Sequence, residues 1–159
     1  MNIQIICIGK LKERYWTEAV SEYAKRLSAY CSLEITELKE ARLPEKAGSA
    51  EEEKVKIEEG REILKAVKDG TYLITLEILG KPLTSTEMAK KMEDLPLAGK
   101  SHLTFVIGGS LGLSQEVSKR ADFKLSFSNM TFPHQMMRVI LLEQIYRAYK
   151  INRNETYHK

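Results

Sequence analysis

Cysteine is scarce in this sequence: only Cys7 and Cys31 occur among 159 residues, and neither lies near a second cysteine or a histidine. Cys7 stands inside the apolar run IQIICIG, where a thiol usually behaves as a small buried hydrophobe. Disulfide frameworks and structural zinc sites need paired or clustered cysteines. We therefore expect no disulfide and no metal, a pattern that fits a reducing compartment.

Long apolar runs are also missing. No stretch approaches the ~18 apolar residues that a transmembrane helix requires. The first apolar run is short and is interrupted by Gln4, and neither a basic lead nor a cleavage site accompanies it. These absences predict a cytoplasmic protein that makes no contact with a membrane.

The common nucleotide-binding motifs are absent too. The apolar run HLTFVI is followed by GGSLG, in which Ser110 occupies the place that a GxGxxG motif gives to its second glycine. The phosphate-loop motif GxxxxGK[ST] does not occur. Glycines after a strand allow a backbone to approach a ligand closely. Taken alone, Gly108, Gly109 and Gly112 fit either a ligand-binding loop or a tight turn.

The composition is that of an ordinary globular protein with a mild basic excess. Hydrophobic residues make up 43% and charged residues 30%, and the length fits one domain over residues 1–159. The net charge is +3, and the last 29 residues, from Thr131, carry five Lys or Arg against two Glu. The whole excess thus lies at the C-terminal end, which permits a polyanionic partner such as RNA.

Short apolar runs alternate with amphipathic segments along the chain. This alternation predicts an α/β fold with parallel βαβ units, about five to six strands in a mainly parallel sheet, and helices on both faces. The expected strands span 3–9, 33–39, 71–78, 102–109 and 123–127; the expected helices span 15–30, 50–70, 84–95 and 114–120, with a long last helix whose first position is Pro133.

Three strand ends are candidates for a ligand site, because ligands of open α/β sheets collect at the carboxyl ends of strands. The first follows Leu76, the second is the glycine loop that begins at Gly108, and the third is the segment FSNMTFPHQ. In the third, Pro133 would place His134 in the first turn of the last helix, beside free N–H groups and the positive end of the dipole. A simple helix cap with a surface histidine explains this segment equally well.

The last helix is apolar around almost its full circumference. A helix of this kind must be buried on more than one side, and a second subunit is the simplest cover, so we expect a homodimer. Arg138 lies within this apolar surface, so it is a candidate interface or substrate residue; an acidic group, a phosphate or a helix end across the interface would serve as its partner. The tail INRNETYHK adds Arg153, Tyr157 and His158, which form either an RNA-facing set or a frayed terminus.

Over essentially its full length, the sequence resembles the RlmH (YbeA-like) family of the SPOUT superfamily. The matching segments are IGKLKERYW, ITLEILGKPLTS, FVIGGSLGL, LSFSNMTFPHQMMRVILLEQIYRAYKI and the final YHK. The resemblance implies a C-terminal trefoil knot, a rare exception to unthreaded chains, and an S-adenosylmethionine pocket. The residues implied for that pocket are Leu76, Gly108, Phe127, Ser128, Asn129, Met130, Thr131 and Phe132; Asn129 stands where many relatives are expected to have lysine.

The reaction implied by the resemblance is methylation of N3 of a pseudouridine in large-subunit (23S) ribosomal RNA, within the assembled 70S ribosome, without a metal. His134 or His158 could accept the N3 proton, Arg153 or Arg138 could stabilise the imide anion, and Tyr157 could stack on a base. A dimeric RNA- or ribosome-binding factor without catalysis is the alternative. The α/β pattern alone would also fit a flavodoxin-like protein.

Overall fold

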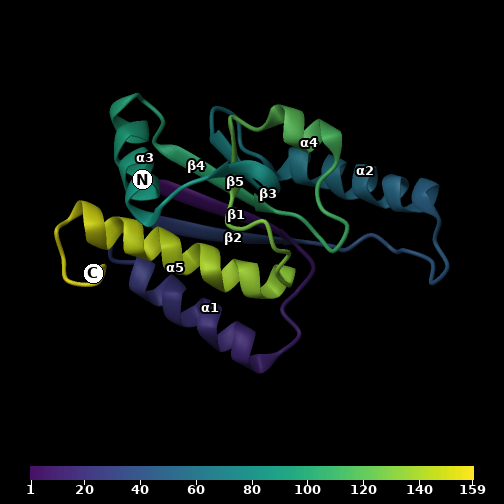
Figure 1. Ribbon diagram of the computed structural model, residues 1–159, viewed down its shortest axis with the longest axis horizontal. Helices are drawn as coiled ribbons and strands as arrows, with labels where there is room; N and C mark the ends of the chain where they lie inside the picture. Colours follow the sequence, from purple (N-terminus) through teal and green to yellow (C-terminus); the bar gives the residue numbers. More distant parts are fainter.

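The sheet has five strands, all of them parallel, in the order β2-β1-β4-β3-β5 (Figure 1). The computed structural model describes residues 1–159. The α/β class and the parallel sheet predicted from the sequence are confirmed. In chain order the elements are β1 (Asn2–Ile8), α1 (Arg14–Leu27), β2 (Ser32–Leu38), α2 (Ser49–Ala66), β3 (Tyr72–Pro82), α3 (Ser85–Leu97), β4 (His102–Ile107), α4 (Gln115–Arg120), β5 (Phe123–Ser126) and α5 (His134–Asn152).

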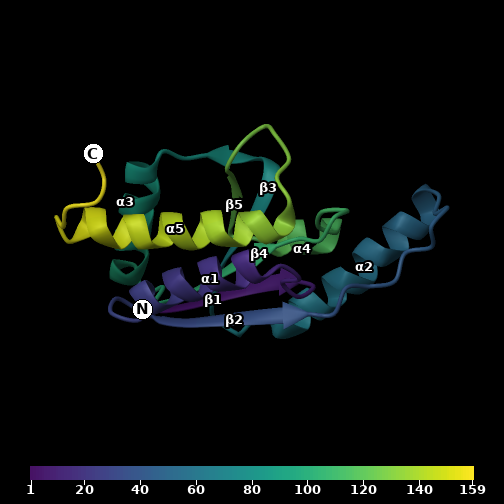
Figure 2. The same ribbon diagram turned by 90° about the horizontal axis from the view of Figure 1, so that it is seen from below.

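Both faces of the sheet are covered, because the central strands are apolar on both sides. Along β1, Ile5 belongs to the larger core cluster, which α1, α3 and α5 supply, whereas Ile6 belongs to the smaller cluster under α2 and α4. Figure 2 shows α1 and α5 layered on one face, and α2 running out beyond the end of the sheet. Burial on both faces explains why β1 and β4 read as nearly continuous apolar runs.

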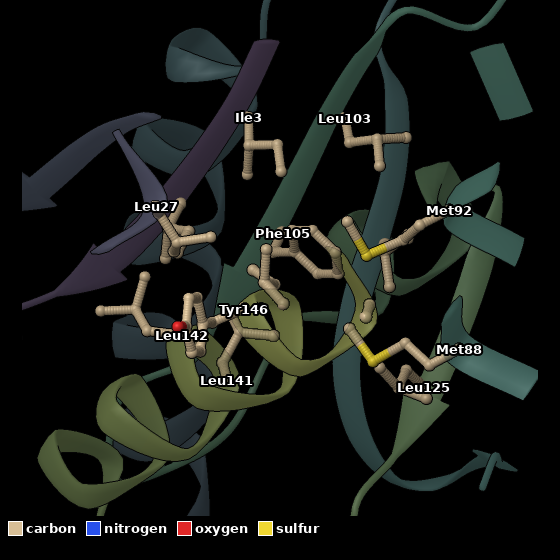
Figure 3. Packing of buried hydrophobic residues seen from close by; sticks show 14 of the residues in the cluster. Ile3, Leu27, Met88, Met92, Leu103, Phe105, Leu125, Leu141, Leu142 and Tyr146 are labelled. Atoms are coloured by element: carbon tan, nitrogen blue, oxygen red, sulfur yellow. The ribbon is translucent and has the colours of Figure 1, made fainter. Parts of the chain in front are cut away.

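The larger core is centred on Phe105 of β4, which is fully buried (Figure 3). Met88 and Met92 reach it from α3, and Leu141 and Leu142 reach it from α5. The side of α5 that carries Leu141, Leu142, Ile145 and Ala148 is thus buried within its own chain. None of the five helices combines the length and the apolar character that crossing a lipid bilayer would require.

Strand β3 is longer and less regular than the sequence predicts. Its pairing with β5 shifts between Leu76 and Lys81, both of which are opposite Leu125. The intervening segment bulges outward, and Leu79 is 98% exposed. Gly80 allows the chain to return, because a Cβ there would lie 2.7 Å from the carbonyl oxygen of Lys124. Local alternation could not predict this bulge, since it depends on the distant strand β5.

Helix ends are partly as expected. Helix α3 begins with a capping box, in which the Thr84 hydroxyl accepts a hydrogen bond from the Glu87 amide and the Glu87 carboxylate accepts one from the Thr84 amide. The prediction that the second helix extends to residue 70 is wrong. It ends at Ala66, where the carbonyl accepts a hydrogen bond from the Gln4 side chain, and Val67 is extended. Pro133 is the N-cap of α5 rather than its first residue.

Candidate functional site

A cavity of about 290 Å³ opens at the carboxyl ends of three neighbouring strands, β4, β3 and β5. It lies where ligands of parallel α/β sheets usually bind. Its walls come from the end of β3, the loop after β4, the segment between β5 and α5, and the first turn of α5. The lining residues are Leu76–Ile78, Ile107–Leu113, Leu125, Phe127, Ser128, Met130–Phe132, His134 and Met137.

The structure brings together most of the cofactor-binding residues that the sequence suggested. Of the eight proposed cofactor residues, seven line the cavity: Leu76, Gly108, Phe127, Ser128, Met130, Thr131 and Phe132. Asn129 is exposed and does not line it. Met137 and Leu113 were missed. The spacing of Met137, three residues after His134 on one helix, could have indicated that the two share a face.

The glycine loop after β4 forms a tight turn. The amide of Gly112 donates to the carbonyl of Gly109 at 3.0 Å, and Gly112 has a φ of +84°. A Cβ on Gly108 would come within 3.0 Å of the Gly112 backbone. Glycine is thus needed at 108 for close packing inside the loop, and at 112 for the left-handed backbone conformation.

The cavity wall is largely apolar and nearly free of charge. Ten of its 18 residues are hydrophobic, and Glu77 is its only carboxylate. The two Glu77 oxygens accept hydrogen bonds from the Thr75 hydroxyl at 2.6 Å and from the Ser118 hydroxyl at 2.8 Å. Such a wall suits a ligand with a flat apolar body whose polar edge meets backbone groups.

His134 is the one catalytic candidate that lines the cavity. Burial lowers the pKa of its imidazole, and the nearby Arg138 guanidinium lowers that pKa further. Both effects favour the neutral form of the ring, which can accept a proton. The loop after β1 packs against the same turn of α5, where the Lys12 amide donates to the Gln135 side chain at 3.1 Å.

Arg138 lies outside the cavity lining and is buried, with 2% exposure. Its Nη1 donates to Glu37 Oε2 at 2.6 Å, and its Nη2 donates to the Gly9 carbonyl at 3.3 Å. Its partners therefore lie within the same chain, at the ends of β1 and β2. This arrangement attaches the first turn of α5, and with it the wall that holds His134, to the edge of the sheet.

The tail candidates lie away from the cavity of their own chain. Tyr157 and His158 fold back beside Glu143 and Arg147 of α5, whereas the guanidinium of Arg153 lies 4.7 Å from the Tyr30 ring. Glu143 is nine residues after His134, or about 13 Å along a helix axis at 1.5 Å per residue. The tail and the cavity thus occupy different parts of one long helix.

The chain belongs to the SPOUT methyltransferase family, because the family model described as "Predicted SPOUT methyltransferase" matches residues 1–158. A methyl-donor cofactor is implied by that class. More particularly, the chain is 58% identical to the ribosomal RNA large subunit methyltransferase H of Clostridium novyi (strain NT). It is 57% identical to that of Clostridioides difficile (strain 630) and 55% to a putative one of Methanococcus maripaludis; each match covers 100% of both chains.

The fold is also similar to that of a solved structure, a probable methylase family protein from Haemophilus influenzae Rd KW20. The TM-score is 0.56 at 16% identity, and the match covers 99% of this chain and 70% of the other. This likeness supports the fold.

The ion pair between the buried Arg138 and Glu37 leads to a stability prediction. Glu37→Ala leaves the Arg138 guanidinium without its acidic partner, so we expect the free energy of unfolding to fall by about 1–3 kcal/mol in urea titrations. Glu34→Ala on the same strand is the matched control, because Glu34 pairs with Lys68 at the surface and should change stability by less than about 0.5 kcal/mol. Equal effects of the two variants would contradict this role of Arg138.

Proposed function

We propose that this protein is an S-adenosylmethionine-dependent methyltransferase that modifies large-subunit ribosomal RNA. The observation that carries the proposal is the cavity at the ends of β3, β4 and β5, in a chain that matches the named ribosomal RNA methyltransferases from end to end. The basic excess of the last 29 residues fits a polyanionic substrate.

The cavity residues fit adenosylmethionine. The apolar wall contributed by Leu76, Leu113 and Met137 suits an adenine ring, and the glycine loop offers backbone groups to the polar parts of the cofactor. When bound there, the cofactor would supply an electrophilic methyl group on a positively charged sulfur. The near absence of fixed positive charge in the wall is compatible with that sulfonium.

His134 is the residue we propose as the proton acceptor. The target proposed from the family resemblance is N3 of a pseudouridine, whose N–H must lose its proton before the nitrogen can attack a methyl group. Among the catalytic candidates, Arg153 only donates hydrogen bonds, and burial raises the pKa of the Tyr157 phenol to about 12. Burial favours the neutral ring of His134, and this ring lines the cavity, so His134 is the candidate best suited to act as a general base.

The proposed active form is a homodimer in which the tail of one subunit completes the cavity of the other. Met136 and Ile140 remain half-exposed on α5 although they are apolar, and Leu79 and Met130 are exposed near the cavity mouth. If α5 helices pair antiparallel, the tail of each subunit approaches the first turn of the other. The trefoil knot and the assembled 70S ribosome as substrate belong to this proposal through the family resemblance.

The glycine loop provides the test of the cofactor site. Gly112→Val forces a β-branched residue to a φ of +84° and should reshape the loop, so adenosylmethionine binding measured by calorimetry and methyl transfer to 70S ribosomes should both be lost. Gly99→Val is the matched control, because Gly99 has a φ of +81° and, like Gly112, no atom within 4 Å of an added Cβ. Unchanged cofactor affinity in Gly112→Val would show that the cofactor binds elsewhere.

The dimer proposal is tested by placing a charge on the half-exposed side of α5. Ile140→Glu should leave the monomer folded and shift the protein from dimer to monomer in sedimentation at micromolar concentration. The control is Ile57→Glu on α2, where a residue with 37% exposure lies away from α5. A wild-type protein that sediments as a monomer would contradict the proposal directly.

A further inference from the structure

We propose that Glu143 and Arg147 are positioning residues that hold His158 as a hydrogen-bond donor, through its Nε2–H group, to the target base. Neither residue lines the cavity. The inference rests on the function proposed above, and it assigns His158 a role other than proton acceptor. We call Glu143, Arg147, Tyr157 and His158 the tail clamp.

The tail clamp is built on a well-shielded ion pair. Arg147 donates from Nε at 3.0 Å and from Nη2 at 2.5 Å to the same Glu143 oxygen. The two side chains are only 24% and 18% exposed, although they form an i,i+4 pair on a helix surface. Its bond to Glu143 raises the pKa of Arg147, so the guanidinium stays charged and its orientation is fixed.

The third nitrogen of the Arg147 guanidinium, Nη1, determines which ring nitrogen of His158 carries the proton. Arg147 Nη1 lies 3.1 Å from His158 Nδ1. A guanidinium has only N–H donors, so Nδ1 must accept this hydrogen bond with its lone pair. In a neutral imidazole the proton then resides on Nε2. The free edge of the ring therefore presents an N–H donor, and the lone pair that a general base would need is already engaged.

Tyr157 is fixed by the same pair. Its hydroxyl donates to Glu143 Oε1 at 3.1 Å, and the Arg147 guanidinium lies 4.7 Å from the centre of its ring. The ring also packs edge-to-face on Tyr146 at 5.0 Å. Glu143 and Arg147 thus hold both aromatic residues of the tail.

The backbone turns the tail toward this pair. Asn154 has a φ of 54°, and the Glu155 amide donates to the Lys150 carbonyl at 2.9 Å, which closes the end of α5. The Glu155 side chain accepts from Tyr30 and from Lys150, each at 2.6 Å. The reversal returns Tyr157 and His158 along α5, where they contact Glu143 and Arg147.

A donor at this place has a chemical use. N3 of a pseudouridine lies between two carbonyl groups, and loss of its proton spreads negative charge onto both oxygens. An N–H group held toward one of these oxygens would stabilise this anion, whose N3 forms a bond to the methyl carbon while the methyl–sulfur bond breaks and a neutral thioether leaves. In this arrangement, His134 of one subunit accepts the N3 proton. His158 of the partner subunit donates a hydrogen bond to the resulting anion.

Two substitutions of His158 distinguish a role as hydrogen-bond donor from a role as general base. Gln places an amide N–H near the position of Nε2 but cannot act as a base, whereas Ala removes both functions. In single-turnover methyl transfer to 70S ribosomes, we expect His158→Ala to slow the reaction by about 100-fold or more, and His158→Gln to stay within about tenfold of the wild type. The pH dependence of His158→Gln should match that of the wild type.

Nitrogen NMR of the ¹⁵N-histidine-labelled protein tests the tail clamp itself. The signals of His158, assigned by their loss in His158→Ala, should show an unprotonated Nδ1 and a protonated Nε2. Arg147→Met should let the ring populate both neutral tautomers, and should slow methyl transfer without changing cofactor affinity. Combined with His158→Ala, it should add almost no further loss, because both variants remove the same donor.

Arg26→Met is the matched control. Arg26 also forms an i,i+4 pair, with Glu22 at 3.0 Å, and its guanidinium lies 5.6 Å from the Tyr146 ring. It does not contact the tail, so this variant should leave both the tautomer and the rate unchanged.

Two results would overturn the inference: His158→Gln as slow as His158→Ala, or a wild-type His158 protonated at Nδ1. A wild-type protein that binds adenosylmethionine but methylates no ribosomal RNA would instead refute the proposed function together with the catalytic use of the donor. In that case the NMR result alone decides whether the tail clamp exists.

Discussion

The bond between Arg138 and Glu37 is the interaction on which the arrangement of the site depends. It attaches the first turn of α5 to the carboxyl ends of β1 and β2, at the edge of the sheet where the cavity opens. A buried guanidinium costs much free energy unless it is paired, so the chain keeps this turn in one place relative to the sheet. Together with the buried Leu141 and Leu142 of α5, this attachment holds His134 and Met137 in the cavity wall.

Different parts of α5 contribute to different parts of the proposed site. Its first turn closes the cavity, its middle carries Glu143 and Arg147, and its far end reverses into the tail. Within one subunit the cavity and the tail are separated along the helix. In a two-fold dimer with antiparallel α5 helices, the tail of each subunit would lie beside the cavity of the other.

Much of this site could be predicted because the signals were local. Apolar runs bounded by glycine or proline indicate β4 and the start of α5. The rule that ligands bind at the carboxyl ends of strands places Leu76, Gly108 and Phe127 at one site. The family resemblance supplied the chemistry. The bulge of β3 and the early end of α2 were not predictable in this way, since each depends on a residue far along the chain: Lys124 at Gly80, and Gln4 at Ala66. The same holds for the Arg138–Glu37 pair, whose members are separated by 101 residues.

A mixed dimer tests most directly whether one active site is shared between two subunits. One subunit would lack Tyr157–Lys159 and keep its cavity; the other would carry Gly112→Val and keep its tail. Two different affinity tags would allow the heterodimer to be purified and assayed for methyl transfer to 70S ribosomes. The account predicts that both homodimers are inactive and that the heterodimer recovers about half of the wild-type activity, because one of two equivalent sites is intact. An inactive heterodimer, or full activity in the tail-deleted homodimer, would contradict it.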